Sequence, residues 1–192
     1  MRGHHLAIYN FGLHIDDYES PRVEGFRLRE PLNFEAANRA EGFAGRSGYD
    51  GEPGPESWGK KVYPRFIAGS GFLDAPSSLS LWVSLEALMA FSYNGVHADA
   101  LKHARNWNQR QAWPALVLWW VAEGDLPVWA DGAERLEHLA DHGPTPRAFT
   151  FKTPFCPDGK AIGIDREGVK AIAARNAAGQ EDLLAVAKTL KA

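Results

Sequence analysis

The spacing of apolar and polar residues predicts three clear strands and three weaker ones. Residues 5–12 (HLAIYNFG) are apolar and β-prone, with the polar Asn10 at the end of an apolar row. Residues 78–83 alternate polar and apolar positions. Residues 115–121 (ALVLWWV) are apolar throughout, so both faces of that strand are expected to be covered. Shorter or edge strands are expected around residues 43–49, 62–72 and 148–151.

Helical spacing of apolar residues predicts most of the remaining regular structure. Ser84 is placed to cap the helix that follows it. Residues 130–142 carry an amphipathic pattern and precede Gly143, which favours a helix end. A helix is predicted over residues 23–39, with a break at Pro31. Further helices are expected over residues 96–107 and, broken near Gly179, over residues 164–192.

The predicted order of elements indicates a fold class. Strand, helix, strand, strand, helix, strand is typical of an α+β fold of the ferredoxin-like, split βαβ type with an antiparallel sheet. Helices cover one face of such a sheet and leave the other bare. Because residues 115–121 are apolar on both faces, we expect the bare face to be buried against a second copy of the chain, in a homodimer. This interpretation assigns residues 1–157 to one domain and residues 158–192 to a helical C-terminal extension.

Composition narrows the class of protein further. No apolar run among the 192 residues reaches the roughly 18–20 positions of a membrane span, and the start lacks the apolar core of a leader. We therefore expect no membrane contact and no export. Lys and Arg number 21 against 24 Asp and Glu and are scattered, which argues against nucleic acid as a partner. The single cysteine, Cys156, cannot form an internal disulfide, so the cytoplasm is the simplest location.

Several runs of sequence together resemble one known family. They are residues 79–88 (LSLWVSLEAL), 116–121 (LVLWWV), 135–139 (RLEHL), 142–146 (HGPTP) and 149–151 (FTF). These runs are similar to an uncharacterised bacterial family placed with the antibiotic-biosynthesis-monooxygenase-like proteins. Over residues 5–157 the resemblance implies a monooxygenase-like dimeric α/β barrel, and it names no settled reaction.

Within that superfamily, the resemblance implies a haem site. Haem-degrading members place an Asn on the first strand, a Trp at the end of the third and a His on the next helix. Asn10, Trp82 and His97 look like that set. A neutral His coordinates haem iron, an Asn amide binds a ligand on the iron, and a Trp packs on the macrocycle. Cofactor-free members instead activate an aromatic substrate toward oxygen, for which Asn10, Trp82 and Arg105 fit equally.

The other candidate residues each have a structural interpretation as well. Trp107 and Trp120 are candidates to bind a ligand together with Arg105, but tryptophans also build cores and dimer interfaces. His138 and His142 have the spacing of two metal ligands on one helical face. A third ligand is not evident, and histidines near a helix C-terminus favour the negative end of its dipole. A structural role is therefore the simpler interpretation of this pair.

Two functions follow from these candidates. The first is a small-molecule enzyme of the monooxygenase-like type, with haem or without a cofactor, that acts on a hydrophobic or aromatic substrate. The second is a non-catalytic protein that binds haem or another hydrophobic ligand. Under either function, Asn10, Trp82 and His97 are expected to converge on one cavity on the helix side of the sheet.

Overall fold

The computed structural model describes residues 3–191; residues 1–2 and 192, at the outer ends of the two expected domains, lie outside the described residues. The chain divides into two compact units. Unit 1 contains the residues up to 12, 44–83 and 111–164, and unit 2 contains residues 13–43, 84–110 and those from 165 onward. Each unit is thus built from three separate stretches of chain. The expected domain boundary after residue 157 stays a prediction.

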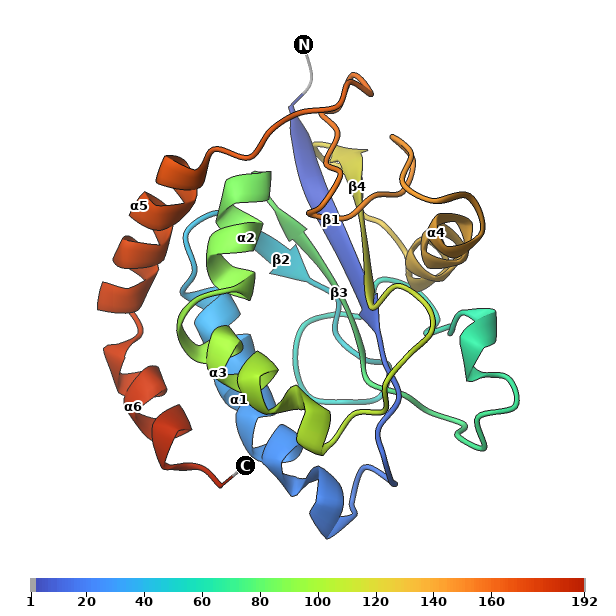
Figure 1. Cartoon of the computed structure of the whole chain (residues 1–192), viewed down its shortest axis with the longest axis vertical. Coiled ribbons are helices and arrows are strands. Elements are labelled where there is room, and N and C mark those ends of the chain that lie inside the picture. Colours follow the sequence, from blue (N-terminus) through green and yellow to red (C-terminus); the bar gives the residue numbers. More distant parts are fainter. Residues whose placement is uncertain (1–2, 192) are drawn as a thin grey trace. The chain divides into compact units, whose positions relative to one another are not determined.

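A four-stranded sheet organises unit 1. Its strands are β1 (His4–Phe11), β2 (Phe43–Arg46), β3 (Ser77–Trp82) and β4 (Leu116–Ala122), in the order β2-β3-β1-β4 (Figure 1). The central strand β1 pairs antiparallel with both β3 and β4. The predicted α+β class and antiparallel sheet are therefore confirmed, and the arrangement is consistent with a ferredoxin-like unit.

Helix α4 (Trp129–His142) packs on one face of this sheet, beside β1 and β4 (Figure 1). Its Gly132 lies so close to Tyr9 of β1 that an added Cβ would come within 2.5 Å of the tyrosine ring. Trp129 meets the same ring edge-on, with ring centroids 6.2 Å apart. The Arg135 guanidinium carbon lies 5.0 Å from the centroid of the Trp119 ring. The Tyr9 face of the sheet is therefore covered by α4.

The two adjacent tryptophans of β4 point to opposite faces of the sheet, as strand alternation predicted. Trp119 pairs with Ala7 of β1, whereas Trp120 pairs with Leu6, the next residue along. Trp119 faces α4. On the other face, the indole N–H of Trp120 donates a hydrogen bond to the Phe155 carbonyl at 2.6 Å. Both indoles thus have partners within unit 1.

Burial within the single chain bears on the expected homodimer. Val117, Leu118 and Trp119, in the middle of β4, are each at most 3% exposed without any second copy of the chain. A partner sheet is not needed to remove these side chains from water, which weakens the argument that predicted it. The face-to-face homodimer and the barrel stay predictions.

Unit 2 consists of helices that pack on a small apolar core. Its helices are α1 (Glu24–Asn38), α2 (Leu85–Ser92), α3 (Gly95–His103), α5 (Arg166–Ala178) and α6 (Glu181–Thr189), with the 3₁₀ turns η1 (Pro21–Val23) and η3 (Ala104–Asn106). α5 lies along α2, and α6 lies against α1 and α3 (Figure 1). Ala36, Val96, Leu183 and Ala187 form one buried cluster. Within residues 3–191, no helix combines the length and the apolar content needed to cross a membrane.

Local sequence explains where several of these helices begin and end. Ser84 caps α2, because its Oγ accepts a hydrogen bond from a first-turn amide at 3.1 Å. α4 ends at Gly143, whose φ of 72° favours glycine. The expected break at Pro31 is wrong, since α1 continues through it. Pro31 removes one amide donor, whereas Arg29 and Ala36 on either side of it are at most 2% exposed, so packing holds the helix together.

The strand expected over residues 62–72 is also wrong. The structure has a 3₁₀ turn there, η2 (Arg65–Ile67). The Arg65 backbone amide donates to the Glu137 carboxylate of α4 at 2.7 Å, and the Phe66 ring stacks on Trp113 with centroids 5.0 Å apart. These contacts hold the segment through one backbone amide and one aromatic side chain, and the proline before the turn has no amide to give to a sheet.

Residues 148–151 do not form the expected strand either. Phe149 and Leu118 exchange two backbone hydrogen bonds of 2.8 and 2.9 Å, which make a single bridge at the edge of β4. The Thr153 amide then donates to the Thr150 carbonyl and closes a turn that ends the pairing. The helical stretch predicted beyond residue 164, with a break near Gly179, is confirmed as the two helices α5 and α6.

Candidate functional site

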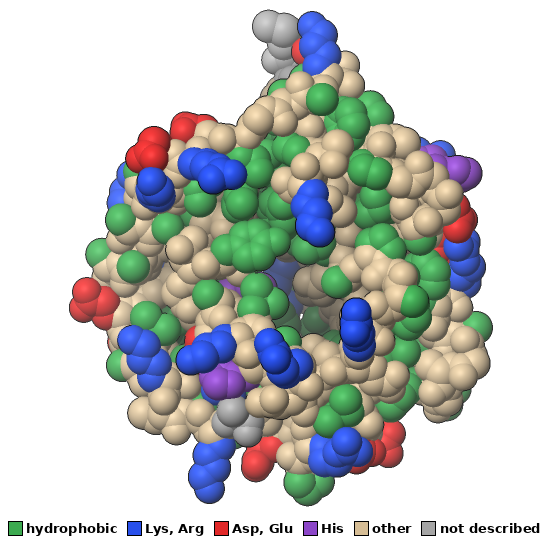
Figure 2. Space-filling model, viewed as in Figure 1, with side chains coloured by type: hydrophobic (Ala, Val, Ile, Leu, Met, Phe, Trp, Pro, Cys, Tyr) green, Lys and Arg blue, Asp and Glu red, His purple; other side chains and the backbone are tan. Residues whose placement is uncertain are grey.

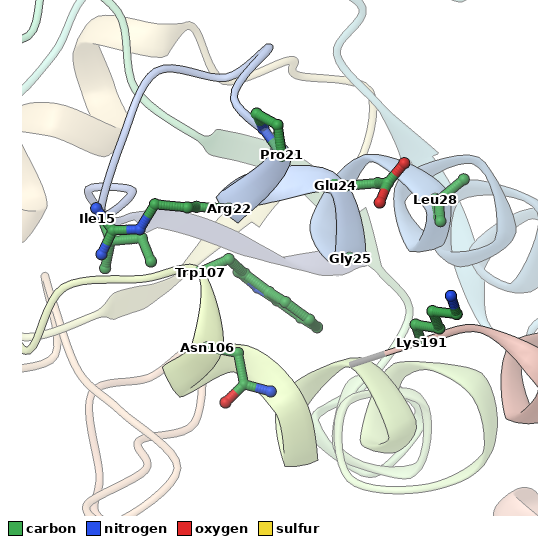
Figure 3. Close-up of a pocket in the computed structure, with 9 residues that line it drawn as sticks. All are labelled: Ile15, Pro21, Arg22, Glu24, Gly25, Leu28, Asn106, Trp107 and Lys191. Atoms are coloured by element: carbon green, nitrogen blue, oxygen red, sulfur yellow. The ribbon is translucent and has the colours of Figure 1, made fainter.

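Trp107 follows η3 and lies at the centre of a pocket within unit 2. Its amide donates to the Ala104 carbonyl at 3.3 Å, and its carbonyl accepts from the Ile15 amide at 2.9 Å. These bonds tie η3 to the segment that leads into η1, so the indole is held between α1 and η3 (Figure 3). Trp107 is only 2% exposed. The indole is therefore held rigidly, and only a small part of it borders the pocket.

The pocket has a volume of about 370 Å³, which is near the lower end of the roughly 300–1,000 Å³ that small-molecule sites occupy. Leu28 of α1 supplies apolar surface and Asn106 supplies an amide, while Arg22 and Lys191 bring cations to the rim (Figure 3). The lining is completed by Ile15, Pro21, Glu24, Gly25 and Trp107. Such a lining suits a molecule with a flat apolar body and polar edges.

Gly25 allows the indole to approach the α1 backbone. A Cβ built on Gly25 would lie 2.7 and 2.9 Å from two carbons of the Trp107 ring, and 3.6 Å from the Lys191 carbonyl oxygen. The helix backbone, the indole and the segment after α6 therefore meet at one point. A larger residue at position 25 would clash with the indole.

Arg29 is a buried cation behind the same wall. Its side chain is 2% exposed, and its Nε donates to the Asp99 carboxylate of α3 at 3.0 Å. Its terminal nitrogens donate to the backbone carbonyls of Gly25 (3.1 Å), Leu190 (3.2 Å) and Lys191 (2.9 Å). The guanidinium carbon lies 5.4 Å from the centroid of the pocket's indole. One ion pair and three carbonyls thus compensate the desolvation of this charge.

Two of the residues expected in the site, Asn10 and Trp82, share a face of the sheet but do not meet. Asn10 pairs with Ser78 and Trp82 pairs with Leu6, four positions along β1, which is about 13 Å at the rise of a strand. The Asn10 amide donates to Ser78 Oγ at 2.8 Å and accepts from the Ser78 backbone amide at 3.0 Å. The Trp82 indole donates to Ser80 Oγ at 3.0 Å. The structure therefore does not bring these two side chains into one cavity.

His97 lies on α3 in unit 2, whereas Asn10 and Trp82 belong to unit 1. His97 Nδ1 lies 2.8 Å from the Ser92 carbonyl oxygen, so this nitrogen donates and Nε2 carries the lone pair. Burial lowers the pKa of His97 below its usual value near 6.5, which keeps the ring neutral at pH 7.

This tautomer of His97 suits an iron ligand, but its surroundings do not suit haem. The Phe91 ring lies 4.9 Å from the imidazole centroid. Neither the Trp107 pocket nor a small hollow beside Phe91 is lined by His97. The contacts of Asn10 and Trp82 lie within unit 1 and those of His97 within unit 2, so a joint haem site of these three residues stays a prediction.

The three residues expected to bind a ligand lie in three different surroundings. Trp107 lines the pocket in unit 2, as described. Arg105, two residues earlier, is exposed and does not belong to the lining. Trp120 lies in unit 1, where its indole is bonded to the segment after α4. Of the residues predicted to bind a ligand, Trp107 is the one for which the structure provides a pocket.

His138 and His142 do form a pair on α4, with ring centroids 4.6 Å apart. His138 Nε2 lies 3.2 Å from Thr145 Oγ1, which connects the helix to the turn after it. The nearby Asp141 carboxylate is bound by the Arg65 guanidinium, which lowers the pKa of Asp141. Among residues 3–191, no group of three or more His, Cys, Asp or Glu side chains could hold a metal ion.

Sequence reasoning missed Arg29, although a signal was present. Gly25, Arg29, Leu32 and Ala36 recur at spacings of four, three and four, so Arg29 lies on an apolar stripe of α1. A charged residue on such a stripe requires a buried partner. The rim cations Arg22 and Lys191 carried no such signal, because exposed Lys and Arg are common, as the visible face in Figure 2 shows.

The fold and the pocket define a mixed α+β protein with a helix-lined pocket beside a buried arginine. Over residues 5–163 the chain matches the family described as Domain of unknown function (DUF3291), and it belongs to that family. No curated protein and no solved structure matches it. The uncharacterised family expected from the sequence is therefore shown, whereas its placement with the monooxygenase-like proteins stays a prediction.

Proposed function

We propose that this chain is a small-molecule-binding protein, which takes one ligand with a flat apolar body into the Trp107 pocket. The observation that carries the proposal is a cavity of about 370 Å³ with a buried indole at its base and a polar rim. A ligand inserted here removes apolar surface from water against Leu28, while the Asn106 amide orients its polar edge. Of the two functions expected from the sequence, this is the binding alternative.

The lining supports binding more directly than catalysis. Arg22 and Glu24 are exposed at the rim, and exposed side chains lack the fixed geometry that general acid–base chemistry requires. The groups implied for a monooxygenase-like reaction, Asn10 and Trp82, bind serines of the sheet. The proposal needs neither a cofactor nor a second copy of the chain.

The proposal is tested with N-phenyl-naphthylamine, a neutral fluorophore that brightens in apolar surroundings. We expect the protein to bind one probe per chain. Leu28→Asp should weaken binding about tenfold, equivalent to about 1.4 kcal/mol, because it places a carboxylate on the apolar side of the cavity.

A matched control is available on a neighbouring helix. Leu101 of α3 is 46% exposed, close to the 43% of Leu28, and it does not line the pocket. Leu101→Asp should leave the affinity for the probe unchanged. Equal losses in the two variants, or no loss in Leu28→Asp, would show that the probe binds elsewhere and that the pocket is not the site.

A further inference from the structure

We infer that the segment Leu190–Lys191 is an internal ligand of Arg29, and that an acidic group on the pocket's ligand displaces it. The inference rests on the proposed function and deepens it. It assigns the ligand to the class of flat apolar molecules that carry a carboxylate, sulfonate or phosphate.

The Arg29 guanidinium donates four hydrogen bonds to described residues. Asp99 and the Gly25 carbonyl hold it toward α3 and α1. The two remaining bonds go to the carbonyls of Leu190 and Lys191. A neutral carbonyl is a weaker partner for a guanidinium than an anion, which forms shorter and stronger charge-assisted bonds and engages two nitrogens at once. The two terminal nitrogens of Arg29 that face this segment can therefore bind an acid group in place of the two carbonyls.

The segment that binds these two nitrogens, Leu190–Lys191, makes few other contacts by hydrogen bonding. α6 ends at Thr189, and beyond it Leu190 is half-buried and Lys191 exposed. Apart from the bonds to Arg29, the described hydrogen bond of this segment joins the Leu190 amide to the Ala187 carbonyl at 3.2 Å. Short exposed segments with few bonds open at little free-energy cost. Displacement therefore requires only that the acid group bind Arg29 better than the carbonyls do.

The position of the segment connects Arg29 to the pocket. Lys191 lines the cavity, and its carbonyl oxygen lies 3.6 Å from the Cβ position of Gly25, against which the indole packs. Figure 3 shows Lys191 at one side of the Trp107 ring. A ligand in this cavity that displaces the segment would bring its acid group to the place that the Lys191 carbonyl occupies. Arg29 and Asp99 lie within the family match, whereas residues 190 and 191 lie beyond it.

The test uses two probes with the same aromatic body. N-phenyl-naphthylamine is neutral, and anilinonaphthalene sulfonate adds one acidic group. One variant ends after Thr189 and lacks both carbonyls. The matched control, Lys191→Ala, keeps both carbonyls and loses the same amine, so the comparison isolates the backbone segment from the charge of Lys191.

We expect the shortened chain to bind the sulfonate probe about tenfold more tightly than Lys191→Ala does, because the competing carbonyls are gone. The affinity for the neutral probe should agree within about twofold between the two variants. In the full chain, saturating sulfonate probe should accelerate hydrogen exchange at the Leu190 amide, whereas the neutral probe should not. Arg29→Lys in the shortened chain should remove the gain.

The outcomes separate this inference from the function on which it rests. A neutral probe that does not bind the full chain refutes the proposed function, and the sulfonate probe on the shortened chain then decides the inference by itself. Equal gains for both probes would show that the segment is only a steric wall. No gain for the sulfonate probe would show that Arg29 does not receive the acid. Either result overturns the inference.

Discussion

Replacing Gly132 with alanine should destabilise the protein, although alanine is the better helix former. Gly132 lies inside α4, where glycine costs roughly 1 kcal/mol relative to alanine, so propensity alone predicts a gain. The added Cβ, however, would lie 2.5, 2.7 and 2.7 Å from three carbons of Tyr9. Two opposing effects are thus set against each other at one position.

The structure indicates which effect is larger. Tyr9 is fully buried on the central strand β1, and the Trp129 ring packs against it. Because its Cβ is fixed by that strand, the tyrosine cannot move aside without shifting the sheet. Overpacking of a core typically costs about 1–3 kcal/mol, and three contacts of this length belong at the upper end of that range. After the helix gain is subtracted, we expect a net loss of about 2 kcal/mol in the free energy of unfolding.

Urea denaturation followed by far-ultraviolet circular dichroism measures this loss. Gly163→Ala serves as the control, because a Cβ at position 163 meets no atom within 4 Å and should change stability by less than about 0.5 kcal/mol. A Gly132→Ala variant as stable as the parent would refute the close packing of α4 on β1.

Two further perturbations test the helices of unit 2. Ser84→Ala should lower the free energy of unfolding by about 1 kcal/mol, since it removes the cap of α2, whereas Ser84→Asp should retain most of the stability. Burial lowers the pKa of folded His97, so protonation of the unfolded chain below about pH 6.5 favours unfolding. Between pH 7 and 5 the parent should lose stability more steeply than His97→Gln, by up to about 1.4 kcal/mol per pH unit; parallel curves would contradict a buried neutral imidazole.

The sequence predicts those parts of the fold that local patterns record. The alternation of residues 78–83 and the apolar run 115–121 report burial directly, so β3 and β4 lie where expected. Residues 62–72 fail for the opposite reason. The stacking of Phe66 on Trp113 joins positions far apart in the chain, and no local pattern contains that contact.

The candidate site was predictable in smaller part. Trp107 was expected to bind a ligand and lines the pocket, but the sequence could not identify which of seven tryptophans borders a cavity. Asn10 is the polar residue at the end of an apolar row, and its amide has a hydrogen-bond partner. That partner is Ser78 across the sheet, a pairing set by strand register, which sequence pattern leaves open.

The alternation of the chain between its two units has a consequence during synthesis. β1 is made first, but its neighbours β3 and β4 begin only at Ser77 and Leu116. Until then both edges of the central strand are unpaired, and such edges invite pairing with other chains. Neither unit is complete early, because unit 1 ends only at residue 164 and unit 2 takes its last residues from position 165 onward. We therefore expect the emerging polypeptide to depend on chaperone protection until late in translation, and to fold slowly once complete.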